Sequence, residues 1–156
     1  MFLVTNLLNT AKGNQDSCEH RWENGHHVDL GCLWMEKTSP KKTFTQARRY
    51  CNKYNSRLME ILTEEQMNFT VAKLKENCPA ADCEWWGGAN KKSEGSWLWD
   101  ESGNSVASFI WVDGEEPTLP DTSVQYSSCF KSTSDYQGEA CRGNKLLPIC
   151  QRKYTH

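Results

Sequence analysis

The chain carries, in its first half, apolar residues at the spacing of an amphipathic helix. These residues recur every three or four positions: Phe44, Ala47, Cys51 and Tyr54. Thr43 stands just before them, with Gln46 three residues later, which is the pattern of an N-terminal capping box. We therefore expect a capped helix that points Cys51 into the core.

The next segment repeats this arrangement. Thr63 and Gln66 form a second capping-box pattern, ahead of a stripe of apolar residues: Met67, Val71 and Leu74. Cys78-Pro79 should end this second helix, because proline cannot continue one. Asn68-Phe69-Thr70 is an N-glycosylation sequon, although three-residue patterns also arise by chance. Asn68 lies off the apolar stripe, so we expect any glycan there to stay outside the core.

The remaining segments have the character of strands and turns. Residues 18–36 are predicted to form an extended hairpin, with Glu23-Asn24-Gly25 as its turn and residues 30–35 as a strand. After Cys83 come short strand-like pieces, whose tryptophans we expect in the core: Trp85, Trp86, Trp97, Trp99 and Trp111. Residues 113–128 show little periodicity, which favours a functional or disordered loop.

Composition places this pattern in one domain of the extracellular type. The chain has 156 residues, enough for one core, and an apolar fraction of only 37%. Eight cysteines without any CxxC pair indicate disulfide bonds rather than structural zinc. We therefore expect a secreted, extracellular protein.

The first residues give weak support for export. Residues 1–13 are mostly apolar at the start and end in the small-x-small pattern of Ala11-Lys12-Gly13. They fit a truncated signal peptide or a disordered leader of the mature protein, and the domain proper is assigned to residues 14–156. No apolar run has the length of a membrane span, so we expect none.

The net charge of −2 excludes a general attraction to nucleic acid or to acidic membranes. A locally basic stretch does occur, and we expect it to be a solvated helix face: Lys41, Lys42, Arg48, Arg49, Lys53 and Arg57.

Several motifs, in this order, resemble the C-type lectin-like domain family over residues 18–152. They are a Trp-Gly core motif, an acidic-glycine turn with a Trp-x-Trp strand, a later tryptophan, a Glu-Pro dipeptide and a closing strand: Trp85-Trp86-Gly87-Gly88, Glu94-Gly95-Ser96-Trp97-Leu98-Trp99, Trp111, Glu116-Pro117 and Leu147-Pro148-Ile149-Cys150. The resemblance implies an α+β fold, in which two helices flank small antiparallel sheets and a long loop region, stapled by disulfides.

Spacing alone leaves all 105 pairings of eight cysteines open. The resemblance implies three bridges and leaves the last two cysteines to each other: Cys51 with Cys150, Cys129 with Cys141, Cys18 with Cys32, and Cys78 with Cys83.

Calcium-dependent sugar binders of this family carry a Glu-Pro-Asn or Gln-Pro-Asp loop and further acidic ligands near the following cysteines. This chain has Glu116-Pro117-Thr118 in the loop, Ser127 two before Cys129, and Gln137-Gly138 four and three before Cys141. Calcium needs six to eight oxygen ligands, so we expect no usual calcium site, no other metal and no cofactor. Scattered acids leave an unorthodox site as an alternative to plain solubility: Asp113, Glu115, Asp121, Asp135 and Glu139. In the family the peptide bond before the proline of this motif is often cis. The resemblance implies the same for Pro117, although less strongly because Thr118 follows it.

The long loop can still present a recognition surface without metal. We expect its ligand-binding residues to be Glu116, Pro117, Thr118, Asp121 and Tyr136. Tyr126 and Tyr136 would stack on a sugar ring, with packing beside a disulfide as the structural alternative.

An enzyme is not expected. The four histidines lie at the chain ends or in the hairpin, at positions 20, 26, 27 and 156, and the cysteines are expected to be bridged. The phosphate-loop, zinc-protease and nucleophile-elbow motifs do not occur. The three histidines of the hairpin could form a zinc site with Cys18 and Cys32, but we expect these two cysteines to form a disulfide bond instead.

The sequence therefore predicts a secreted lectin-like domain that recognises a glycan without calcium, in innate defence. One alternative is a protein-binding module that has lost sugar binding, and another is a structural component of extracellular matrix or biomineral. The partner is accordingly a glycan or an extracellular protein, because one fold serves many functions.

Overall fold

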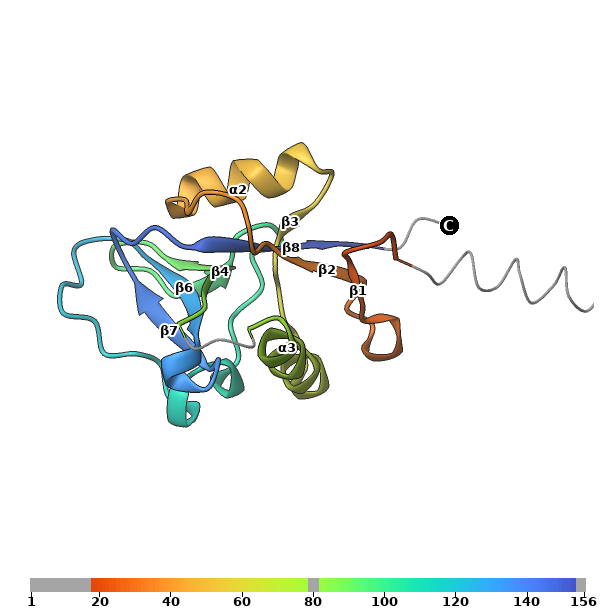
Figure 1. Cartoon of the computed structure of the whole chain (residues 1–156). Coiled ribbons are helices and arrows are strands. Elements are labelled where there is room, and N and C mark those ends of the chain that lie inside the picture. The colour runs from red at the N-terminus through yellow and green to blue at the C-terminus, as the bar shows by residue number, and fades with distance from the viewer. Residues whose placement is uncertain (1–17, 79–81, 154–156) are drawn as a thin grey trace, which may run out of the picture.

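The computed structural model describes residues 18–78 and 82–153, and the leader predicted for residues 1–13 lies outside them (Figure 1). Its two α-helices lie on opposite sides of a sheet, with α2 on one side of β8 and α3 on the other (Figure 1). The α+β class expected from the sequence is confirmed. Neither helix has the length and apolar character needed to cross a membrane, within the described part of the chain.

Both predicted helices begin where the capping boxes place them. Helix α2 spans Phe44–Lys53, and helix α3 spans Glu64–Glu76. In each, the threonine side chain at the N-cap accepts from the backbone of a glutamine three residues later, and the glutamine side chain reciprocates. The predicted stripe of α2 is buried except for Tyr54, which lies at the C-cap and is 39% exposed. The spacing of apolar residues predicted one buried position too many, because the helix ends at Lys53.

The strands form one mixed sheet. They are β1 Glu23–Asn24, β2 Cys32–Met35, β3 Arg57–Leu58, β4 Glu84–Lys91, β5 Trp97–Trp99, β6 Tyr126–Lys131, β7 Gly138–Cys141 and β8 Leu147–Arg152. The order is β1-β2-β8-β4-β6-β7, with β3 also pairing β8 and β5 also pairing β4. Every pair is antiparallel except β4 with β8, which is parallel and joins the predicted small sheets into one. Short 3₁₀ turns connect them: η1 His26–Val28, η2 Ser108–Ile110, η3 Val112–Gly114 and η4 Ser132–Ser134.

The N-terminal hairpin exists, but its turn lies further along than predicted. Glu23 and Asn24 belong to strand β1 and pair with β2, and the turn occupies residues 25–31. Asp29 and Gly31 adopt positive φ values of 58° and 79° there. A Cβ at Gly31 would lie 2.4 Å from the carbonyl oxygen of Arg152, so glycine is required where the turn meets β8.

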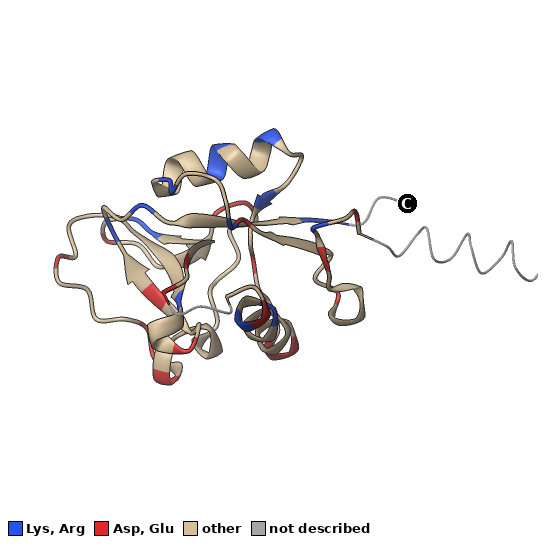
Figure 2. Ribbon diagram, viewed as in Figure 1, with Lys and Arg blue, Asp and Glu red and all other residues tan. Residues whose placement is uncertain are grey.

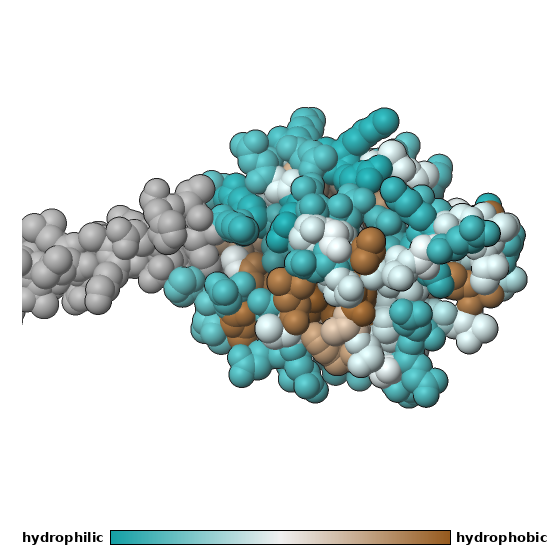
Figure 3. Space-filling view, turned by 180° about the vertical axis from the view of Figure 1, so that it is seen from behind, coloured by the Kyte–Doolittle hydropathy of each residue, from teal (hydrophilic) through white to brown (hydrophobic). Residues whose placement is uncertain are grey.

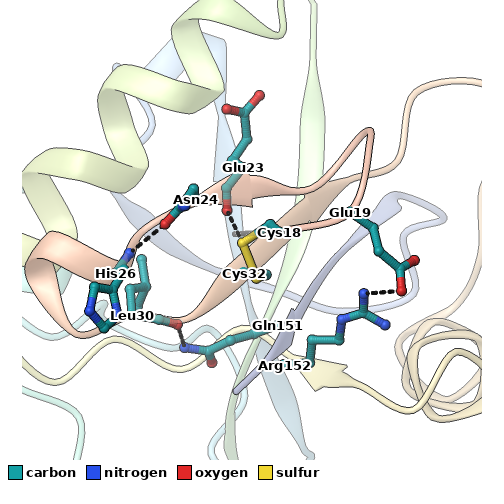
Figure 4. The surroundings of a disulfide bond; sticks show 9 residues. All are labelled: Cys18, Glu19, Glu23, Asn24, His26, Leu30, Cys32, Gln151 and Arg152. Carbon is teal, nitrogen blue, oxygen red and sulfur yellow. Dashed lines mark hydrogen bonds and ion pairs between the residues drawn. A yellow bond between two sulfur atoms is a disulfide. The ribbon is translucent and has the colours of Figure 1, made fainter. Parts of the chain in front are cut away.

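The three disulfides implied by the resemblance are present, and so is the fourth, between the two cysteines that it left to each other. Their pairs are Cys18–Cys32, Cys51–Cys150, Cys78–Cys83 and Cys129–Cys141. Figure 4 shows the first, which fastens the start of the hairpin to strand β2. The zinc alternative for Cys18 and Cys32 is therefore wrong, since their sulfurs are bonded to each other.

The predicted tryptophan core is confirmed, with all five rings at most 2% exposed: Trp85, Trp86, Trp97, Trp99 and Trp111. Trp85 and Trp86 donate their indole N–H groups to the carbonyl oxygens of Glu36 and Lys42, at 3.0 and 2.8 Å. The backbone after them packs tightly, because a Cβ at Gly88 would lie 2.8 Å from two main-chain carbonyl oxygens. This Trp-Gly segment thus ties β4 to the chain that precedes each helix.

The basic stretch follows helix α2 on the outside of the molecule (Figure 2). Lys41, Arg49 and Lys53 are exposed, as predicted for a solvated face. Arg48 pairs with Asp100 at 3.1 Å. Figure 3 shows the reverse side, where hydrophilic residues dominate the upper part and hydrophobic residues gather below the middle.

Candidate functional site

The long loop joins η3 to β6 and occupies residues 115–125, at the left of Figure 1. Glu116, Thr118 and Asp121 are exposed on it, and Pro117 is half-buried. The structure thus brings four of the five predicted ligand-binding residues onto one surface segment.

The base of this loop is fixed by hydrogen bonds. The hydroxyl of Tyr126 accepts from the backbone N–H of Asp121 at 3.3 Å. One carboxylate oxygen of Asp121 accepts from the backbone N–H and the hydroxyl of Ser123, at 2.9 and 2.6 Å. These bonds lower the pKa of Asp121, with a further contribution from the charge of Arg142. Asp121 therefore presents an ionised carboxylate near a cation.

Tyr136, the fifth predicted residue, does not belong to this surface. It is only 5% exposed, and its ring packs against Trp85 with centroids 6.0 Å apart. Tyr126 is 8% exposed. The structural alternative is correct for both rings, since a buried ring offers no face on which a sugar can stack.

The positions that hold calcium ligands elsewhere in the family have different surroundings here. Ser127 is 5% exposed within β6. A Cβ at Gly138 would lie 2.9 Å from the carbonyl oxygen of Ile110 and 3.0 Å from the ring of Trp111, so no ligand side chain fits. In residues 18–78 and 82–153, no three His, Cys, Asp or Glu side chains gather closely enough to hold a metal ion. The scattered loop acids are accordingly not brought together.

The peptide bond before Pro117 is trans, because no cis peptide occurs in the described ranges. The family's frequent cis proline therefore has no counterpart here.

Sequence reasoning missed a second surface, which we call the aromatic groove. Its volume is about 500 Å³, and it lies between the hairpin, residues 36–39 and the C-terminal end of α2. Trp34, Tyr50 and Tyr54 contribute its rings. Tyr50 lies on α2 and Tyr54 at its C-cap, four residues later, a spacing that places side chains on one side of a helical turn, and this signal was available.

A buried carboxylate supports the wall of the aromatic groove. Glu36 is 5% exposed and accepts from the backbone N–H groups of Lys37, Thr38 and Ser39, at 2.9, 3.0 and 3.3 Å. It also accepts the hydroxyl of Tyr50. Burial opposes the charge of Glu36, but these donors outweigh it and lower the pKa of its carboxyl. Burial and this carboxylate together raise the pKa of Tyr50.

Asn68, the predicted glycosylation site, is exposed on α3. The core-facing side of this helix is formed by Gln66, Met67, Thr70 and Leu74, while Val71 is only partly buried. Modification of Asn68 stays a prediction.

These features define a class: a disulfide-linked α+β domain with a polar loop and a separate aromatic groove at its surface. The sequence matches the family described as "Lectin C-type domain" over residues 40–152, which is more than half of the chain. The chain therefore belongs to the C-type lectin domain family.

Solved structures of similar fold agree. CEL-IV has 20% identity and a TM-score of 0.68, with 90% of this chain and 96% of that chain covered. The C-type lectin CEL-I from Cucumaria echinata has 18% identity and a TM-score of 0.69, with 89% and 99% covered. At these identities the likeness shows a shared fold. A comparison with curated protein sequences finds no match.

Proposed function

We propose that this domain binds carbohydrate through the loop of residues 115–125, without calcium and outside the cell. The observation that carries this proposal is the contrast between two sets of positions. Glu116, Thr118 and Asp121 face solvent with polar groups, whereas Ser127 and Gly138 stand where calcium ligands would be needed.

The loop has suitable chemistry for sugar hydroxyls. The ionised Asp121 accepts hydrogen bonds, and the nearby Arg142 donates them. Thr118 adds a hydroxyl that does both. Hydrogen bonds to charged groups are stronger than neutral ones, so Asp121 should contribute most to affinity.

An extracellular setting is supported by the four disulfides, which persist in oxidising surroundings. Secretion and a role in innate recognition of foreign glycans belong to the same proposal.

A glycan array, run with and without a chelator, tests this function. We expect binding to neutral glycans that survives chelation. Asp121→Asn should weaken it, since the amide loses the charge, and Thr133→Ala, an exposed change outside the loop, should leave it unchanged. Loss of binding upon chelation contradicts calcium independence, and an array without any signal contradicts sugar binding.

Protein recognition is the second candidate, and the burial of Tyr126 and Tyr136 favours it. Without those rings the loop has no aromatic platform for a sugar. A blank array together with one protein captured from extracellular fluid, and lost in Asp121→Asn, would support this alternative.

A further inference from the structure

The aromatic groove gathers three rings, of which Trp34 and Tyr50 also pack against the edge of the core. Trp34 is its central ring, with centroids 5.9 Å from Tyr50 and 5.1 Å from Tyr54. Tyr50 and Tyr54 are 5.1 Å apart. Tyr54 is 39% exposed, and the other two are partly buried. Aromatic surface left in contact with water in a concave site indicates a binding function.

The wall and floor of the groove are rigid. Tyr50 donates its hydroxyl to the buried Glu36, and Lys42 lies 4.4 Å from the centre of the Tyr50 ring. Strand β2, which carries Trp34, pairs with both β1 and β8. The rings are therefore held in place before any ligand arrives, which reduces the entropy cost of binding.

The carboxylates at the groove are already engaged. Glu36 accepts from three backbone N–H groups and from Tyr50. Glu23 lies 3.5 Å from the ammonium of Lys73 and accepts from the amide of Asn77. Neither carboxylate is left to attract a cationic ligand.

The cations at the groove are not engaged. Arg21 and Lys37 are exposed, and their side chains make no hydrogen bond or ion pair with the residues that the structure describes. Lys53 adds charge nearby, 6.0 Å from the centre of the Tyr54 ring. What the groove offers to a ligand is thus an aromatic surface bordered by unpaired positive charge.

We infer that the aromatic groove is a second ligand site, which binds an acidic sugar: a pyranose ring that carries a carboxylate or a sulfate. The C–H face of the sugar packs on Trp34 and Tyr54, while its acidic group pairs with Arg21 and Lys37. A groove of about 500 Å³ has the size of ordinary small-molecule sites. An arginine suits this role because its planar guanidinium binds carboxylate and sulfate oxygens in pairs.

Isothermal titration with three tetrasaccharides tests the inference: a heparin-derived sulfated one, an oligogalacturonate and neutral maltotetraose. The two acidic probes distinguish sulfate from carboxylate as the recognised group. We expect at least one acidic probe to bind, with an affinity that falls as salt rises, and maltotetraose not to bind in the groove.

Two charge reversals, Arg21→Glu with Lys37→Glu, should weaken acidic-probe binding by about tenfold or more, since each change removes an attractive charge and adds a repulsive one. Tyr54→Ala should also weaken it. Lys92→Glu with Lys145→Glu, which reverses the same number of exposed charges outside the groove, is the matched control and should have no effect. The thermal midpoint of each variant shows that it is folded.

The inference is overturned if neither acidic probe binds the unaltered protein, or if the double reversal and the Lys92 and Lys145 control bind alike. The inference is also overturned if an acidic peptide binds in the groove while neither acidic sugar binds there. This site is separate from the loop proposed above. Asp121→Asn should leave acidic-probe binding intact, so failure of one site is distinguishable from failure of the other.

Discussion

The Cys51–Cys150 disulfide should contribute more to stability than any other cross-link in this chain. It joins helix α2 to strand β8 across 99 positions of sequence, whereas Cys78–Cys83 spans 5. A cross-link restricts the unfolded chain in proportion to the logarithm of the loop it closes. The two bridges therefore differ in loop length and also in burial, since Cys51 and Cys150 are buried whereas Cys78 and Cys83 are partly exposed.

The chain-entropy relation gives the expected magnitudes. Closing 99 positions removes about 4.7 kcal/mol of unfolded-state freedom, and closing 5 removes about 2 kcal/mol. Cys51 and Cys150 are 0% and 1% exposed, so their replacement also leaves space in the core, which adds to the loss. Since 1 kcal/mol corresponds to about 2 to 4 °C in a domain of this size, Cys51→Ala with Cys150→Ala should lower the thermal midpoint by about 10 to 20 °C.

Urea unfolding, followed by tryptophan fluorescence, measures both double variants against the unaltered protein. We expect Cys51→Ala with Cys150→Ala to lose at least twice the free energy of unfolding lost by Cys78→Ala with Cys83→Ala. Equal losses would show that loop closure does not govern stability here. A larger loss in the Cys78 and Cys83 variant would refute the reasoning outright.

Three further predictions concern single positions. Because the pKa of Glu36 is lowered in the folded state, its ionised carboxylate stabilises the fold fully above its ordinary pKa of 4.5, and this stabilisation is lost as the pH falls through the folded-state pKa. Tyr50→Phe removes one hydrogen bond that lowers this pKa, so the variant should lose less stability between neutral and acid pH. Acid titrations followed by circular dichroism measure the difference. Gly88→Ala should cost about 1 to 3 kcal/mol in urea unfolding, because two carbonyl oxygens occupy the space of a methyl group, whereas Gly95→Ala should cost less. Secreted protein from eukaryotic cells should lose mass upon glycosidase treatment, and Asn68→Gln should abolish that change; an unaltered mass in the unsubstituted protein rejects glycosylation.

The fold was predictable where its determinants are local. Thr43 and Thr63 mark helix starts through contacts within four residues, and the structure confirms both. The hairpin turn was misplaced because its determinant is distant: Gly31 has to approach the backbone of Arg152, far along the chain. Tyr54 was misassigned because periodicity alone does not reveal where a helix ends.

The candidate sites differ in the same way. The surface position of Glu116 and Asp121 was predictable because one aperiodic segment contains them, and such segments lie at the surface, while their role in binding stays a prediction. Tyr136 was misjudged because a tyrosine serves equally well in a core or at a ligand, and only packing against Trp85 decides between the two. The aromatic groove was not predictable as a unit, since the hairpin, helix α2 and the end of α3 each supply part of it.

The two surfaces depend on different cross-links, which bears on how this domain can recognise ligands. The loop of residues 115–125 leads into β6, and Cys129–Cys141 joins that strand to β7. The aromatic groove lies on the hairpin and α2, which Cys18–Cys32 and Cys51–Cys150 fasten to the sheet. Because each surface is ordered by its own covalent bonds, a change in one need not disturb the other. A chain that engages a neutral sugar at the loop and an acidic one in the groove would then gain affinity for mixed polysaccharides through effective concentration rather than through new contacts.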